Sequence, residues 1–397
     1  MPLIDADFER PFPDSEYERR FKSAQELMAS NDLDVLLLTD PTNQHYLSGY
    51  ESESYYTFQM LILIAGEDEP LFVARNMEER AAGITTWLSD DRIRCYTDEY
   101  APNSLYHPVD WVQDLLGEFE ATDGRIGVEK SSQYLSIDTL DRLQSQLTDA
   151  EIVDVSMLIN RLYLHKSDAE LEYMRKAAEI TDRGMETAAE VIAEGVREND
   201  AVAEVLRTLV RGTDEFGGTM PSVTPATGPY HFTFSDRTFK DGDVFGLEFS
   251  GCVRNYYSPL CRTFSIGEPS SEVRELWQAL DEDLQLILDT VEPGRTCEEV
   301  EQIYRAEANY PKAARSGYVI GLGVTSWAEG TTSFTEGDDT VLRPGMTFHS
   351  NPSIDTLNYP GGIGPNGLRM LHSETYVVTE DGCEVFGSYP RQLIVID

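Results

Sequence analysis

The residues best suited to chemistry lie between positions 229 and 267. His231 precedes a turn there, and the strand that follows carries one carboxylate, Glu248, among apolar neighbours. A carboxylate in an apolar strand is costly to bury unless a cation faces it or its pKa shifts. Both residue types can transfer protons near neutrality, so this segment is the first candidate for a chemical site. The structural alternative is an internal ion pair of Glu248 with Arg254 or Arg262.

Common catalytic motifs are missing from the rest of the chain. The six histidines form no HExxH pair and no helical spacing suited to zinc. The sequence contains neither GxSxG nor a Walker loop. The glycine-rich stretch at 361–367 lacks the Lys-Ser/Thr that follows a phosphate-binding loop, so we interpret it as a turn between strands.

The charge of the chain excludes several classes of partner. Its 397 residues include 71 Asp and Glu against 31 Lys and Arg, of which only six are Lys, for a net charge of −40. Such a surface repels nucleic acid and anionic membrane. The 41% hydrophobic content is enough for a core, and the acidic composition indicates a salty cytosol. An odd number of cysteines without CxxC, and an N-terminus unlike a signal peptide, predict a cytoplasmic protein with reduced thiols.

The elements that must position the candidate site fall into two domains. Helical and strand patterns alternate over residues 1–155, which predicts an α/β domain. Residues 156–397 read as α+β, with long helices starting near Ser167 and Thr296, each with a capping-box sequence. Strands are expected at 243–250, 262–266, 347–354 and 375–378.

Four segments resemble the creatinase/aminopeptidase P family in the same order along the chain. They are DPTNQHYLSGY at 40–50, the segment 229–267, LRPGMTF at 342–348 and SETYVVTEDG at 373–382. The resemblance implies an N-terminal α/β creatinase-type domain, a C-terminal pita-bread catalytic domain, and a homodimer.

The positions that hold metal in this family carry unsuitable residues here. Metal-using members bind two ions with two Asp, one His and two Glu, and a dinuclear site needs several carboxylates. The resemblance places these ligands at Glu248, Pro259, Tyr318, Asn351 and Ser373. We therefore predict no catalytic metal and no cofactor.

The match is greater to the metal-free members, above all to the ectoine hydrolase branch. The similar segments are EFSGC at 248–252, YYSPLCRT at 256–263, GYVIGL at 317–322, WAEGTTS at 327–333 and PGMTFHSNP at 344–352. His231 takes the position of the proton-carrying His of creatinase. Cys261 replaces the carboxylate that binds creatine, which disfavours creatine itself. The resemblance thus implies hydrolysis of a C–N bond in a cyclic amidine, with ectoine opened to N-acetyl-diaminobutyrate.

Ectoine is a small zwitterion with a delocalised cationic ring. The roles expected for the candidate residues follow from these charged groups. His231 would carry protons, and Glu248 would either hold the amidinium or attack its carbon. Glu329 and Glu374 are further carboxylates for the ring nitrogens. Tyr318 and His349 would donate to the substrate carboxylate, and Trp327 would cover the cation. Each of these last three residues also has a purely structural interpretation. Two other functions stay open, a metallopeptidase that cleaves Xaa-Pro bonds and a non-catalytic binding protein.

Overall fold

The computed structural model describes residues 9–100, 106–219, 222–224, 234–310, 316–325, 327–355 and 368–397. The chain divides into two compact units, Met1–Tyr163 and Leu164–Asp397. The boundary predicted from the sequence, after residue 155, lies before this division. Among the described residues, no helix is long and apolar enough to cross a membrane.

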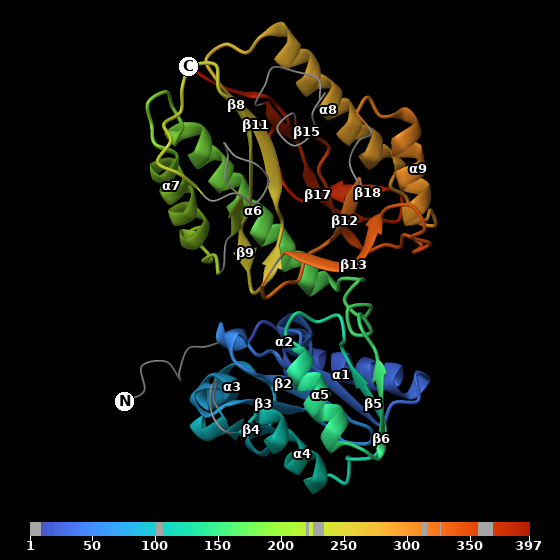
Figure 1. The fold of residues 1–397 in the computed structure, drawn as a ribbon. Coiled ribbons are helices and arrows are strands. Elements are labelled where there is room, and N and C mark those ends of the chain that lie inside the picture. Colours follow the sequence, from blue (N-terminus) through green and yellow to red (C-terminus); the bar gives the residue numbers. More distant parts are fainter. Residues whose placement is uncertain are drawn as a thin grey trace. The chain divides into compact units, whose positions relative to one another are not determined.

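The N-terminal unit is an α/β layer around a six-stranded mixed sheet (Figure 1). The strand order is β4-β3-β2-β1-β5-β6. The strands are β1 (Val35–Leu38), β2 (Met60–Ile64), β3 (Leu71–Arg75), β4 (Ile93–Tyr96), β5 (Gly124–Val128) and β6 (Ala150–Asp154). The helices are α1 (Asp14–Ser30), α2 (Pro41–Ser48), α3 (Glu79–Thr85), α4 (Pro108–Glu118) and α5 (Ile137–Gln146), with short 3-10 turns at Ser54–Tyr56, Asn76–Glu78, Asp90–Arg92 and Asp98–Tyr100. Apolar strand residues pack on α4 and α5, which gives this unit its own core.

The C-terminal unit holds two larger sheets. One has the order β19-β11-β8-β7 and the other β13-β12-β14-β17-β18. The first comprises β7 (Ser222–Thr224), β8 (Val244–Ser250), β11 (Leu260–Ile266) and β19 (Ile394–Ile396). The second comprises β12 (Gly317–Ile320), β13 (Ala328–Phe334), β14 (Thr347–Ser350), β17 (Glu374–Val378) and β18 (Cys383–Val385). Small ribbons are formed by β9 (Cys252–Val253) with β10 (Tyr256–Tyr257), and by β15 (Ser353–Asp355) with β16 (Arg369–Leu371).

Two helix pairs flank these sheets (Figure 1). The pair α6 (Asp168–Val191) and α7 (Glu198–Arg211) packs on β8 and β11, and the pair α8 (Ser271–Thr290) and α9 (Cys297–Glu307) packs on the second sheet. A side chain at Gly184 would place its Cβ 2.7 Å from Phe249, so this glycine allows α6 to approach the sheet closely. Both predicted capping boxes are present, from Ser167 to Glu170 and from Thr296 to Glu299.

Candidate active site

The antiparallel pair β8 and β11 places Glu248 and Cys261 directly opposite each other. Side chains alternate between the two faces of a strand. Phe245, Leu247 and Phe249 belong to the core shared with α6 and α7. Glu248 therefore points to the opposite face of the sheet, and Cys261 lies beside it. Because apolar residues alternate along β8, this carboxylate faces the interior between the sheets.

The second sheet contributes His349 from β14. Its neighbour Phe348 packs toward the core with α8 and α9, so alternation turns His349 away from those helices. His349 is paired with Tyr318 on β12 and with Thr375 on β17. The site is therefore built where the inner faces of the two sheets meet.

A hydrogen-bond chain fixes the tautomer of His349. The Thr375 hydroxyl donates to the carbonyl oxygen of Pro259 at 2.7 Å. A hydroxyl has only one hydrogen to donate. At 2.9 Å from Thr375 Oγ1, the Nδ1 of His349 must therefore be the donor. The neutral ring then carries a lone pair on Nε2.

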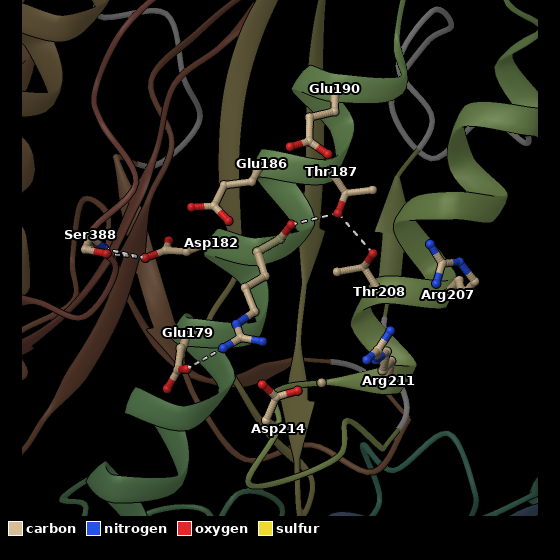
Figure 2. Close-up of a pocket in the computed structure, with 12 residues that line it drawn as sticks. Glu179, Asp182, Glu186, Thr187, Glu190, Arg207, Thr208, Arg211, Asp214 and Ser388 are labelled. Atoms are coloured by element: carbon tan, nitrogen blue, oxygen red, sulfur yellow. Dashed lines mark hydrogen bonds and ion pairs between the residues drawn. The ribbon is translucent and has the colours of Figure 1, made fainter.

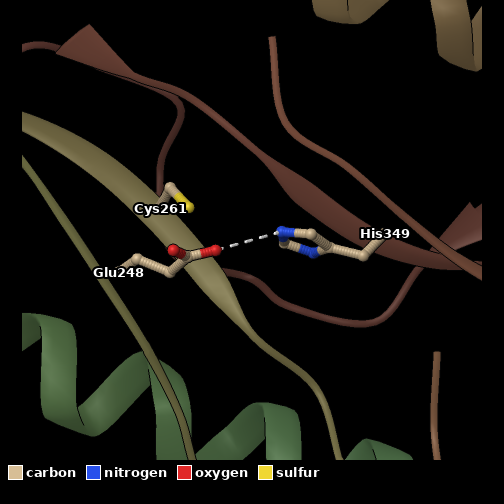
Figure 3. Close-up of side chains that lie close together, drawn as sticks. All are labelled: Glu248, Cys261 and His349. Atoms are coloured by element: carbon tan, nitrogen blue, oxygen red, sulfur yellow. Dashed lines mark ion pairs between the residues drawn. The ribbon is translucent and has the colours of Figure 1, made fainter. Parts of the chain in front are cut away.

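That lone pair points at Glu248 (Figure 3). His349 Nε2 and Glu248 Oε1 are 3.9 Å apart, and Nε2 is buried with no hydrogen-bond partner among the described residues. Burial lowers the pKa of His349 to about 3, so the imidazole is neutral at pH 7. Burial and the nearby Glu248 raise the pKa of the Cys261 thiol, which is thus protonated.

Glu248 and His349 therefore present two acceptors to each other, and the protonated thiol of Cys261 beside them is a weak donor. A carboxylate oxygen and an imidazole lone pair face each other in a fully buried place, beside a thiol. Two facing acceptors repel unless a donor or a cation stands between them. The arrangement is suited to a small cationic group that carries N–H donors, or to a single metal ion.

Glu374 forms a buried ion pair with Arg262. Its Oε1 accepts from Arg262 Nη2 at 2.7 Å, and the two side chains are 4% and 0% exposed. Burial raises the pKa of Glu374 although Arg262 opposes the shift. Arg262 also donates to the backbone carbonyls of Cys261, Ser373, Tyr389 and Pro390. This pairing excludes the expected alternative of a Glu248–Arg262 pair, and it favours a structural role for Glu374 over contact with a substrate.

The buried pair also locks the two sheets in register. Arg262 follows Cys261 in the sequence, and Glu374 precedes Thr375. Beside the ion pair, the Cys261 amide donates to Ser373 Oγ at 2.6 Å. The pair therefore holds Cys261 and Thr375, from two different sheets, close to His349.

The structure describes only some of the other predicted site residues. Tyr318 is 9% exposed, with its ring centroid 5.5 Å from that of His349. Trp327 is partly buried and immediately precedes β13. His231, the side chain of Glu329 and the glycine-rich stretch 361–367 lie outside the described residues. The structure therefore brings Glu248, His349 and Tyr318 together, and the roles of His231 and Glu329 stay predictions.

Two residues of the centre were not among the predicted site residues. Cys261 was noted only as a replacement, and Thr375 was not singled out. The strand pairing of Glu248 with Cys261 follows from a short connection, so counting residues across it could have found the thiol. The contact of Thr375 with His349 spans two strands 26 residues apart and carries no local signal.

A hollow on the surface lies elsewhere in this unit (Figure 2). It measures about 570 Å³ and lies along α6 and α7, with Glu179, Glu186 and Glu190 on α6 and Arg207 and Arg211 on α7. Within the hollow, Arg183 forms an exposed ion pair with Glu179 at 3.5 Å. Charged helix faces of this kind are typical of solvated surface, and we assign it no chemistry.

The sequence matches two family models along most of its length. Residues 172–380 match metallopeptidase family M24, and residues 20–162 match the creatinase/prolidase N-terminal domain. The chain belongs to the M24 family. The predicted fold class, an N-terminal creatinase-type α/β domain followed by a C-terminal pita-bread domain, is confirmed.

Individual M24 relatives span the whole chain. An uncharacterised hydrolase/peptidase of Sinorhizobium fredii is 35% identical and covers 100% of both chains. The ectoine hydrolase of Halomonas elongata is 33% identical over 97% of this chain and 98% of its own. The crystal structure of dipeptidase PepE from Mycobacterium ulcerans superposes with a TM-score of 0.78 at 25% identity, covering 98% of this chain and 100% of that one. The chain is thus a hydrolase of the M24 family.

The residues at the M24 metal positions do not fit a pair of hard cations. Pro259 offers only its carbonyl oxygen, which already accepts from Thr375. The Oγ of Ser373 accepts from the Cys261 amide. Of the five expected positions only Glu248 supplies a carboxylate, whereas such a site needs several. The donor set therefore disagrees with the two-metal chemistry of the family.

Proposed function

We propose that the chain is a metal-independent hydrolase that opens a cyclic amidine, with ectoine as the best candidate substrate. One observation carries the proposal. Glu248 and the lone pair of a neutral His349 face each other across 3.9 Å in a buried centre that lacks the carboxylates of a two-metal site. The likeness to the ectoine hydrolase of Halomonas elongata supports the same substrate class.

An amidinium satisfies this centre better than a neutral amide does. Its positive charge is spread over two nitrogens that flank one carbon, and both nitrogens carry N–H donors. Glu248 would accept a charge-assisted hydrogen bond from the cation. His349 Nε2 would accept a second N–H, which gives the buried lone pair a partner that none of the described residues provides. His349 is therefore proposed as an acceptor, and this geometry replaces the donor role expected from the sequence.

Hydrolysis adds water to the amidine carbon and then breaks one C–N bond, so a proton must leave the water and reach the departing nitrogen. We assign this transfer to His231, as expected from the sequence. Glu248 either anchors the amidinium or attacks its carbon as a carboxylate nucleophile. Trp327 and Glu329 are assigned to the cation, and the phenol of Tyr318 to the substrate carboxylate.

Thr375 tests the proposed state of His349. In Thr375→Val the hydroxyl that holds Nδ1–H is lost, so the ring can rotate or change tautomer. We expect kcat for ectoine to fall about 10-fold, the equivalent of one buried hydrogen bond. Thr375→Ser should restore it. The ¹⁵N chemical shifts of His349 should show the Nδ1–H tautomer in the wild type and in Thr375→Ser but not in Thr375→Val. An unchanged tautomer in Thr375→Val would refute the hydrogen-bond chain as its cause.

The substrate is tested by product analysis. Purified protein incubated with ectoine should yield N-acetyl-diaminobutyrate, identified by its NMR spectrum. Creatine, which also carries a delocalised cationic group beside a carboxylate, should be turned over far more slowly because Cys261 offers its guanidinium no counter-charge. Failure to consume ectoine would remove it as the substrate.

A dipeptidase is the second candidate function. The observation in its favour is the likeness to the PepE structure over nearly the whole chain. Against it stands the donor set, in which Pro259 replaces a metal-binding carboxylate. Hydrolysis of an Xaa-Pro dipeptide that depends on added Mn²⁺ would favour this alternative.

A further inference from the structure

Three different donor atoms converge in the buried centre. They are a carboxylate oxygen of Glu248, the sulfur of Cys261 and a ring nitrogen of His349, all within 4.8 Å of one another (Figure 3). All three residues are buried, and His349 is 0% exposed. Zinc binds sulfur at about 2.3 Å and imidazole nitrogen at about 2.0–2.1 Å in tetrahedral sites. The ligand atoms of such a site lie roughly 3.3–3.8 Å apart, so small side-chain movements bring these three to that spacing.

We infer that Glu248, Cys261 and His349 form a mononuclear site for a borderline or soft divalent cation such as Zn²⁺. One side of the ion would be left for water, because the described residues supply three protein ligands. His349 is already in the required state, since Nδ1–H is held by Thr375 and Nε2 has no hydrogen-bond partner in the part of the chain that the structure describes. On binding, the sulfur–zinc bond forms and the thiol proton leaves to solvent.

This site differs from the two-metal centre of the family in number and kind of ligands. Cys261 and His349 do not occupy any of the five family metal positions, and a thiolate selects Zn²⁺ over Mn²⁺ or Mg²⁺. The ion would occupy the place proposed for the amidinium. If the proposed function holds, Zn²⁺ is therefore a competitive inhibitor of ectoine hydrolysis, and only this consequence rests on the proposed function.

Cadmium is the probe for the site because its bond to a thiolate absorbs in the ultraviolet. We expect the reduced, full-length protein to bind one Cd²⁺ with such a band, and Zn²⁺ to displace it. Cys261→Ala should abolish the band and weaken binding at least about 100-fold, beyond the effect of losing an outer-shell contact. Glu248→Gln should keep the band with weaker affinity.

Cys297→Ala is the matched control, because Cys297 is also buried in this unit but lies on α9. Cys261→Ser covers the case in which the alanine variant does not fold. A band that survives in Cys261→Ala or Cys261→Ser, or that is lost in Cys297→Ala, would overturn the inference, as would the absence of binding to the wild type. Because the titration contains no ectoine, its failure leaves the proposed function untouched, and inactivity on ectoine leaves the titration untouched.

Discussion

The variant Glu248→Gln is expected to hydrolyse ectoine at least about 100-fold more slowly than the wild type, as judged by kcat/KM. The substitution keeps the size of the side chain and removes its charge. It removes the counter-charge of the amidinium if Glu248 is an anchor, and the attacking oxygen if Glu248 is a nucleophile. Both mechanisms therefore predict the loss.

A matched control separates this effect from the general cost of changing a buried glutamate. Glu301 is 1% exposed on α9, accepts from the Ser316 amide and pairs with the exposed Arg305, and a glutamine oxygen can still accept from that amide. Glu301→Gln should keep turnover within about threefold of the wild type. Near-normal activity of Glu248→Gln would remove this residue from the mechanism.

The second large effect concerns stability. Glu374→Leu leaves the guanidinium of Arg262 buried without its counter-charge, and breaking a buried pair in this way costs about 3–5 kcal/mol. The double variant Arg262→Met with Glu374→Leu removes both charges and should recover part of that loss. Urea unfolding of the wild type, Glu374→Leu, Arg262→Met and the double variant, followed by circular dichroism, gives the coupling free energy of the pair.

An exposed ion pair provides the comparison. On α7, Arg207 Nε and Glu204 Oε2 are 2.8 Å apart, and the two side chains are 61% and 46% exposed. Glu204→Ala should change the free energy of unfolding by no more than about 1 kcal/mol. If Glu374→Leu were as mild as Glu204→Ala, the buried pair would not be what holds the two sheets together.

Local signals in the sequence predicted part of the secondary structure, but the strand predicted at 347–354 is two strands, β14 and β15, in different sheets. The strand predicted at 243–250 is β8 with its first residue omitted, and the strand predicted at 262–266 lies within β11. The capping boxes were predicted correctly because their hydrogen bonds join residues only three apart in the sequence. The short helix α2 was missed although Asp40 caps its start and Gly49 ends it in a left-handed conformation.

Long-range contacts limited what the sequence could say about the site. Glu248 was found because a lone carboxylate in an apolar strand is conspicuous. Arg262, one of the two partners considered in the structural alternative, lies opposite Leu247 and instead reaches Glu374, 112 residues further along the chain. The tautomer of His349 depends on Thr375 and on the carbonyl of Pro259, which come together only when the sheets pack. Patterns within one strand do not contain such information.

The most direct measurement is the rate of ectoine hydrolysis by protein that has been exhaustively treated with a chelator, beside its rate on an Xaa-Pro dipeptide with Mn²⁺ added. A metal-independent amidine hydrolase should keep its full rate on ectoine after chelation and leave the dipeptide intact. Loss of ectoine hydrolysis on chelation with recovery on Mn²⁺, or cleavage of the dipeptide alone, would contradict the account.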